Sequence, residues 1–254
     1  MNGVIKIYFH PTCATSHELI VNLYNKGYLD KVEIYNLLKP LENRFVWSVP
    51  WLVKDNEPVG TDPISDDEVI NIIENKDITI ENPVESFMMS ILHSSYASSI
   101  AILHKDLSLL ITDSFIKASI RYGYSGVNIS DLKNELIENK DKLFQEYRDK
   151  IRRALSVSFV RELYWSKSGN IDSNDIVKYS DPTIVGLWLL SKGSIGRIGL
   201  PKKPLIFDDI DVKEVSAFVQ KRGKGLLEKI KEEQENIYND KLYWEILEKS
   251  KKDF

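Results

Sequence analysis

The apolar and polar residues of the first 76 positions follow patterns that predict strands and helices in turn. Residues 4–9 interleave β-branched and aromatic side chains and stop at His10-Pro11, which indicates a strand followed by a turn. Apolar residues then recur at helical spacing from Ala14 until Gly27, a residue typical of a helix end. Residues 32–38 form a second predicted strand. Together these segments predict a βαβ unit, whose two strands pair in parallel.

The remainder of this region predicts a hairpin and a closing helix. Residues 51–54 and 57–61 flank Asp55-Asn56, a pair typical of tight turns, and therefore predict two antiparallel strands. Residues 64–74 carry apolar side chains at helical spacing, which predicts the helix that closes the region.

Beyond residue 78 the pattern becomes almost entirely helical. Asn82-Pro83 is typical of a helix start, with Asn as the cap and Pro at the first helical position. Residues 193–204 form a long loop rich in Gly and Pro. Further helices are predicted over residues 107–121, 131–166, 182–190, 212–222 and 226–238, with a last one starting near Asp240.

The charge balance changes at the same point along the chain. Residues up to Asp77 include 7 basic and 12 acidic side chains, a net of -5, whereas the remainder has 27 basic and 26 acidic ones. A length of 254 residues fits two units, since domains commonly span roughly 100 to 200 residues. We therefore predict an α/β domain over residues 1–78 and an all-α domain over residues 79–254.

The composition is that of a folded globular protein. Hydrophobic residues make up 43% and charged residues 28%, with a formal net charge of -4, which excludes a disordered or fibrous chain. A single cysteine, Cys13, excludes an intramolecular disulfide and any zinc site built from several cysteines of one chain. The amino terminus lacks the pattern of a secretion signal, and no apolar run reaches the ~18 residues of a membrane span. We therefore expect a cytoplasmic protein that does not contact membranes.

One stretch of the second half is basic. Residues 192–231 contain ten basic and five acidic side chains, a local net of +5, which could meet a phosphate, a nucleic acid or an acidic partner. No motif of a nucleic-acid-binding fold accompanies this stretch, and the chain as a whole is acidic. We therefore expect a solvated surface and no nucleic-acid binding.

Cys13 is the candidate for chemistry because it lies between the first predicted strand and the first predicted helix. Free N–H groups and the helix dipole stabilise an anion at such a position, so a thiolate there is a candidate nucleophile. The hydroxyls of Thr12 and Ser16 could donate hydrogen bonds to the sulfur. His10 and His17 could support a thiolate when protonated, although His17 falls one turn into the helix and is expected to face solvent. As a lone cysteine, Cys13 could also be a buried apolar residue without chemistry.

A βαβ unit with a cysteine at its first turn, a Val-Pro pair before a hairpin and a closing helix resembles the thioredoxin-like fold. The likeness covers residues 4–76 and is nearest to the glutaredoxin and glutathione-transferase branches. The family motif Cys-x-x-Cys begins at the position of Cys13, and Ser16 takes the place of the second cysteine, so the motif reads C-A-T-S. The resemblance implies that Cys13 is the catalytic residue.

Two further segments match ligand-binding positions of that family. The family's Val-Pro pair corresponds to Val49 and Pro50, and the resemblance implies a cis bond between them and a Val49 backbone that faces a bound thiol such as glutathione. Thr61 and Asp62 are the nearest counterparts of the group that meets the amino group of the ligand. The expected substrate-binding residues are therefore Thr12, Ser16, Val49, Pro50, Thr61 and Asp62.

The departures from the family pattern shape the expected chemistry. Because Ser16 replaces the second cysteine, an adduct on Cys13 has to be released by an external thiol. Single-cysteine glutaredoxins that bridge an iron–sulfur cluster use the motif C-G-F-S. In this chain Ala14 and Thr15 take the two middle positions, so the middle of that motif is not reproduced. We therefore expect no iron–sulfur cluster, no metal and no other resident cofactor. A thioredoxin-like half followed by an all-α half is also the layout of glutathione transferases. This resemblance implies that Asp181 caps an internal helix of the second half, and it fits a homodimer paired through the helical domains.

The sequence thus leads to two hypotheses of different classes. The first is a single-cysteine thiol–disulfide oxidoreductase, or a glutathione-transferase-like thiol enzyme, that acts through Cys13 on a small thiol or a protein disulfide. The alternative is a non-catalytic adaptor, whose degenerate thioredoxin-like domain serves as a docking module. An exposed and reactive thiol favours the first hypothesis, whereas an inert thiol favours the second.

Overall fold

The computed structural model describes residues 3–38, 46–194 and 209–249. The chain forms two compact units, and the segments of each come from different parts of the sequence. The first unit comprises Met1–Ser90, Thr112–Asn134 and Glu233–Phe254, and the second comprises Ile91–Ile111 and Glu135–Glu232. The first unit contains a small mixed sheet near the N-terminus, and the later part of the chain is mainly helical, as the sequence indicates. The division of the chain at residue 78 stays a prediction.

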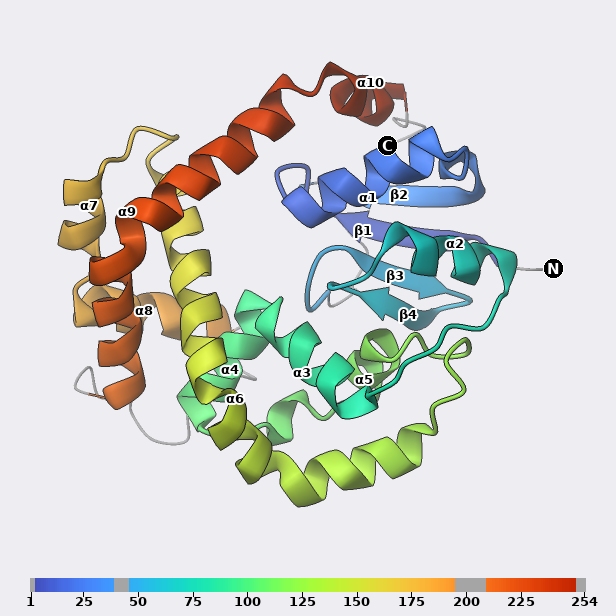
Figure 1. The fold of residues 1–254 in the computed structure, drawn as a ribbon, viewed down its shortest axis with the longest axis horizontal. Helices are drawn as coiled ribbons and strands as arrows, with labels where there is room; N and C mark the ends of the chain where they lie inside the picture. The colour runs from blue at the N-terminus through green and yellow to red at the C-terminus, as the bar shows by residue number, and fades with distance from the viewer. Residues whose placement is uncertain (1–2, 39–45, 195–208, 250–254) are drawn as a thin grey trace. The chain divides into compact units, whose positions relative to one another are not determined.

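The sheet of the first unit has four strands in the order β2-β1-β3-β4 (Figure 1). They are β1 (Ile5–Phe9), β2 (Val32–Asn36), β3 (Trp51–Lys54) and β4 (Glu57–Thr61). β1 and β2 pair in parallel, whereas β3 is antiparallel to both β1 and β4. Asp55 and Asn56 have φ angles of 51° and 66°, which suit the two central residues of a tight hairpin turn. The predicted βαβ unit and the predicted hairpin are therefore confirmed.

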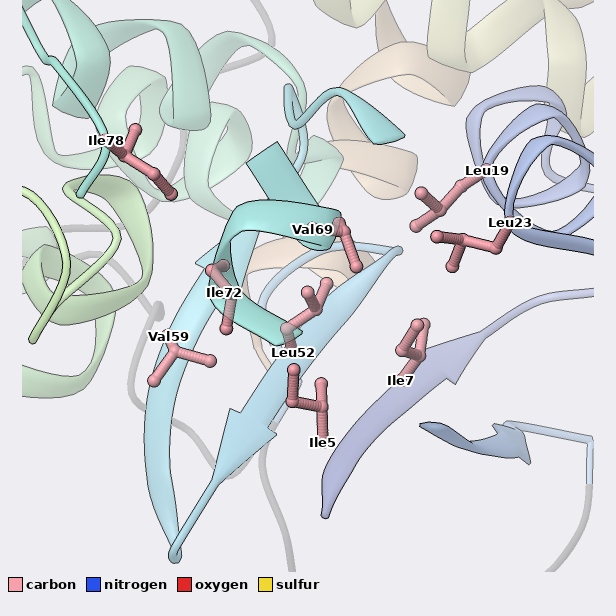
Figure 2. Packing of buried hydrophobic residues seen from close by; sticks show 9 residues of the cluster. All are labelled: Ile5, Ile7, Leu19, Leu23, Leu52, Val59, Val69, Ile72 and Ile78. Atoms are coloured by element: carbon pink, nitrogen blue, oxygen red, sulfur yellow. The ribbon is translucent and has the colours of Figure 1, made fainter. Parts of the chain in front are cut away.

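Two helices, α1 (Ala14–Asn25) and α2 (Asp66–Glu74), cover one face of this sheet. α1 ends before Gly27, whose φ of 73° is a conformation that glycine adopts without steric cost. α2 begins with a capping box, in which the Ser65 hydroxyl accepts from the Glu68 N–H and the Glu68 carboxylate accepts from the Ser65 N–H. Figure 2 shows the side chains that fill the space between sheet and helices. They are Ile5, Ile7, Leu19, Leu23, Leu52, Val59, Val69, Ile72 and Ile78.

Several more helical segments belong to the first unit. α3 (Pro83–Leu92) starts at the predicted Asn82 cap, whose side chain accepts from the Glu85 N–H. The helix predicted over residues 107–121 is wrong, because the chain forms a 3-10 turn, η2 (Ser108–Leu110), and then α5 (Asp113–Ser119). The break arises at Thr112, whose hydroxyl accepts from the Phe115 N–H and so starts a new helix. The start of α6 (Ile129–Ser166), the end of α9 (Ile210–Asn239) and α10 (Lys241–Lys249) also belong to the first unit.

The second unit is helical throughout the part that the structure describes. It contains α4 (Ser95–His104), most of α6 (Ile129–Ser166), α7 (Ser173–Tyr179), α8 (Pro182–Gly193) and most of α9 (Ile210–Asn239). The Asp181 side chain caps α8 as predicted, by accepting from the Thr183 N–H at 2.8 Å. α4 and α7 were not among the predicted helices. Of the predicted loop over residues 193–204, the part from residue 195 lies outside the described residues.

The sequence predicts two separate helices over residues 212–222 and 226–238. The break between them is wrong, because α9 is continuous across this region. Gly223 lies where α7 comes close. A Cβ at this position would stand only 2.3 Å from Cγ2 of Ile176. The glycine therefore permits a close helix contact instead of ending a helix.

A buried ion cluster holds the start of α9 within the second unit. The Asp211 side chain is 0% exposed and binds Arg148 at 2.7 Å and Arg152 at 2.7 Å. Burial opposes the ionised carboxylate, but hydrogen bonds from Arg148 and Arg152 outweigh it, so the pKa of Asp211 lies below its ordinary value. Asp211 therefore remains ionised and keeps both arginines paired.

Among the described helices, no single one is long and apolar enough to cross a membrane. α3 and α4 reach the required length and apolar character only when the two helices are taken together, and a break in the chain separates them.

Candidate functional site

Cys13 is the N-cap residue of α1, at the point where β1 has ended and the helix begins. Its N–H donates to the His10 carbonyl at 3.0 Å, and its carbonyl accepts from the His17 N–H at 2.9 Å. The residue is half-buried, with an extended backbone at φ -84° and ψ 123°. The thiol therefore has the predicted place at the positive end of a helix, where N–H groups favour an anion.

Two groups lie within hydrogen-bond distance of the sulfur. Cys13 Sγ donates to the carbonyl oxygen of Val49 at 3.6 Å, and it lies 3.2 Å from the hydroxyl of Thr15. The Val49-Pro50 bond is cis, as predicted. The fold thus brings the predicted Cys13 and Val49 together, whereas Thr15 is a contact that the sequence analysis did not assign.

Asp62 joins the same polar group from the end of β4. The Thr15 hydroxyl lies within donating distance of Val49 O at 3.4 Å and of Asp62 Oδ2 at 3.5 Å. The Asp62 N–H donates to the carbonyl of Pro50 at 3.2 Å, which ties the end of β4 to the start of β3. Because the Thr15 hydroxyl has one hydrogen, it serves one of these acceptors at a time and can accept from the thiol at the same moment.

Arg121 supports the chain directly after Asp62. Its side chain is 6% exposed, its guanidinium donates to the carbonyl of Pro63, and it pairs with Glu68 at 2.8 Å. Asp62 and Pro63 are joined by a second cis bond, which the sequence analysis did not predict. The position of the Asp62 carboxylate therefore depends on α2 and on the segment that follows α5.

The hydroxyls of Thr12, Ser16 and Thr61 lie differently from that of Thr15. The Thr12 hydroxyl is 3.0 Å from Nδ1 of His10. Ser16 and Thr61 are fully buried, and within the described residues neither hydroxyl has a hydrogen-bond partner. The hydroxyl that lies within hydrogen-bond distance of the sulfur is that of Thr15. Contacts of Thr12, Ser16 and Thr61 with a ligand stay predictions.

The two histidines beside Cys13 have separate surroundings. Burial lowers the pKa of His10, which favours its neutral form near neutral pH. The expectation that His17 faces solvent is wrong, because its Nε2 lies 2.8 Å from Oδ2 of Asp240 and its side chain is 20% exposed. Burial opposes the ionised form of Asp240, but hydrogen bonds from the Tyr243 backbone and from His17 outweigh it and lower the pKa of Asp240.

Residues near the end of the chain contact the loop that carries Cys13. The Tyr243 hydroxyl donates to the carbonyl of Pro11 at 3.1 Å, and the Gln234 amide donates to the carbonyl of Thr12 at 3.0 Å. Burial is the main reason that the pKa of Tyr243 is raised, so its hydroxyl stays protonated. Sequence reasoning missed Tyr243 and Gln234, because more than 200 positions separate them from the loop and no local pattern links the two segments.

Among the residues that the structure describes, no group of three or more His, Cys, Asp or Glu side chains could hold a metal ion. No family model matches the chain, and neither a curated protein nor a solved structure shows significant similarity to it.

Proposed function

We propose that residues 4–76 form a thioredoxin-like domain and that the chain is a single-cysteine thiol–disulfide oxidoreductase acting through Cys13. The observation that carries this proposal is the position of the sulfur, which lies at the start of α1 and 3.6 Å from the Val49 carbonyl. The strand order β2-β1-β3-β4, with one parallel and two antiparallel pairings, supports the thioredoxin-like assignment.

The proposed reaction has two exchange steps. In the first, the Cys13 thiolate attacks one sulfur of a disulfide, a new S–S bond forms, and the second sulfur leaves with the bonding electron pair and takes up a proton. In the second, the thiolate of an external small thiol, such as glutathione, attacks the mixed disulfide and releases the Cys13 thiolate. The chain contains no other cysteine, so the second thiol has to come from solution.

The contacts around the sulfur suit both protonation states. As a thiol, Cys13 donates to the Val49 carbonyl. A thiolate cannot donate, and the Thr15 hydroxyl at 3.2 Å can then donate to the sulfur instead. Thr15 therefore acts in the proposed reaction as the side chain that stabilises the thiolate, both before the attack and when it is released again.

A second candidate is the adaptor function, and one observation favours it. The hydrogen bond from the sulfur to the Val49 carbonyl stabilises the thiol and not the thiolate. If this state dominates, the half-buried Cys13 is chemically idle and the domain serves as a docking module.

Turnover of a small mixed disulfide separates the two candidates. The purified protein is incubated with glutathione and with the mixed disulfide of glutathione and a small thiol that carries a hydroxyl group. The rate at which glutathione disulfide forms is measured. Wild type is expected to accelerate the reaction above the uncatalysed rate, whereas Cys13→Ser keeps the fold and loses the acceleration. If the rate is the same with and without folded wild-type protein, the enzyme hypothesis is contradicted and the adaptor hypothesis remains. Acceleration with an electrophile but not with the disulfide would indicate transferase chemistry at Cys13.

A further inference from the structure

The end of α9 and the start of α10 contact the loop of residues 10–13 within the first unit. We propose that this C-terminal segment positions Cys13 for its reaction, with Tyr243, Gln234 and the His17–Asp240 pair as positioning residues. The inference rests on the proposed function of Cys13. It adds residues from the opposite end of the chain to the machinery of that site.

Both peptide planes before Cys13 are held at both ends. The plane between Pro11 and Thr12 has its carbonyl bound by Tyr243 at 3.1 Å and its N–H directed at Nδ1 of His10 at 3.3 Å. The plane between Thr12 and Cys13 has its carbonyl bound by Gln234 at 3.0 Å and its N–H bound by the His10 carbonyl at 3.0 Å. A peptide plane fixed at carbonyl and N–H cannot rotate freely, so these bonds determine where the Cys13 Cα lies.

The C-terminal segment is itself bound to α1. Asp240 uses both oxygens, because Oδ1 accepts from the Tyr243 N–H at 3.1 Å and Oδ2 lies 2.8 Å from Nε2 of His17. One carboxylate therefore caps α10 and connects it to the first turn of α1. The Tyr243 ring also meets the His17 ring edge-on, with centroids 4.6 Å apart.

An apolar cluster between α1 and the C-terminal segment surrounds these polar contacts. Tyr243 is 0% exposed, and α10, drawn in red, lies beside α1, drawn in blue, in Figure 1. A hydroxyl in such a packed setting has a defined direction, unlike one on a mobile surface side chain. The buried members of the cluster are Phe9, Ile20, Ile237, Tyr243 and Ile246.

The test compares two variants that remove one hydrogen bond each with a control that only weakens packing. Tyr243→Phe keeps the ring and removes the bond to Pro11, and Gln234→Met keeps the length and removes the bond to Thr12. Ile246→Val removes one methylene from the same cluster without touching the loop. Two quantities are measured: amide hydrogen exchange at Thr12 and Cys13, and the rate at which Cys13 forms a mixed disulfide with glutathione disulfide.

We expect both polar variants to speed amide exchange at Thr12 and Cys13. Each should also slow mixed-disulfide formation by roughly 10-fold, since displacement of a reacting group by about 1 Å can cost up to about 100-fold in rate. Ile246→Val is expected to lower the thermal midpoint and leave both quantities unchanged.

The possible outcomes separate this inference from the proposed function. If wild-type Cys13 does not react with glutathione disulfide, the proposed function is wrong, and the positioning is then decided by amide exchange alone. If wild type reacts and both polar variants match it in rate and in amide exchange, the positioning is wrong while the proposed function stands. If the rate falls equally in Ile246→Val, the contacts are merely structural, which also overturns the inference.

Discussion

The sulfur of Cys13 lies 3.6 Å from the backbone carbonyl of Val49, although 36 positions separate the two residues. The contact joins the first turn of α1 to the chain that enters β3. A sulfur that donates to a carbonyl is a thiol, and it loses this bond on ionisation because a carbonyl only accepts. Thr15, whose hydroxyl is 3.2 Å from the same sulfur, is the group that can take over. The site therefore has one contact for each protonation state of Cys13.

Removal of the Thr15 hydroxyl is expected to slow disulfide exchange at Cys13. Thr15→Val keeps the branched shape but cannot donate to the thiolate. A hydrogen bond to a charged group contributes about 1.5 kcal/mol or more, which corresponds to a rate loss of roughly 10-fold or greater. Thr15→Ser retains the hydroxyl and should keep most of the rate. Equal rates for the Val and Ser variants, measured by mass spectrometry of the mixed disulfide, would show that Thr15 plays no part.

A second cysteine at position 16 should change how the adduct on Cys13 is released. Ser16 occupies the first turn of α1, and residues three apart on a helix lie on the same face. Ser16→Cys is therefore expected to attack the mixed disulfide on Cys13 and form an internal disulfide without an external thiol.

The control for this experiment is Ser16→Ala. The Ser16 hydroxyl is buried and has no hydrogen-bond partner among the described residues, so its removal should not lower the free energy of unfolding. After oxidation with glutathione disulfide, intact-mass analysis should show an internal disulfide in Ser16→Cys and a glutathione adduct in Ser16→Ala. A stable glutathione adduct on Ser16→Cys would disprove the expected geometry.

Loss of the Asp211 charge is expected to destabilise the protein strongly. Asp211→Asn leaves Arg148 and Arg152 without their buried anion, and breaking a buried ion pair from one side costs about 3 to 5 kcal/mol. Asp149 pairs with Arg152 but is 74% exposed, so Asp149→Asn should cost less than about 1 kcal/mol. Urea unfolding of both variants checks the difference, and equal losses would contradict a special role of the buried cluster.

The same carboxylate predicts a pH dependence. The pKa of Asp211 is lowered in the folded state, so the unfolded chain binds a proton more readily. Its contribution to stability is therefore fully present above the unfolded value of about 3.9 and is lost as the pH falls through the lower folded value. Wild type should lose stability across this acidic range more steeply than Asp211→Asn. Parallel pH profiles for the two proteins would contradict the assignment.

Two neighbouring glycines of α9 should respond in opposite ways to alanine. Gly225 has no atom within 4 Å of the position of an added Cβ, so Gly225→Ala should stabilise the helix by about 0.5 to 1 kcal/mol. At Gly223 the added atom would lie 2.3 Å from Ile176, and the overpacking should cost about 1 to 3 kcal/mol. Thermal unfolding of the two variants measures both effects. A stabilised Gly223→Ala would mean that α7 does not lie against this glycine.

Local patterns along the sequence predicted the elements that local interactions determine. Asp55-Asn56 indicated the hairpin because both residues tolerate positive φ, and Asp181 indicated the start of α8 because its side chain caps a helix. The position of Cys13 between β1 and α1 also followed from local signals. These predictions depended on neighbours a few residues away.

Contacts between distant segments could not be predicted in this way. Two helices were predicted where α9 is continuous, because the sequence does not reveal that Ile176 packs against Gly223. His17 was expected in solvent because Asp240, its partner, is 223 positions away. Tyr243 reaches Pro11 only through the packing of α10 on α1, and no spacing rule connects the two. The position of the candidate cysteine could therefore be predicted locally, whereas the contacts of its loop with the C-terminal segment could be found only from the fold.

The most direct test of the central claim is the alkylation rate of Cys13 in the native protein. The rate constant for iodoacetamide at neutral pH is compared with that of glutathione, with Cys13→Ser as the blank. A thiol stabilised as the thiolate by a helix terminus should react about 10-fold faster than the free thiol, or faster still. A rate equal to or below that of glutathione in the folded protein would contradict a nucleophilic Cys13 and leave the docking module as the account of this domain.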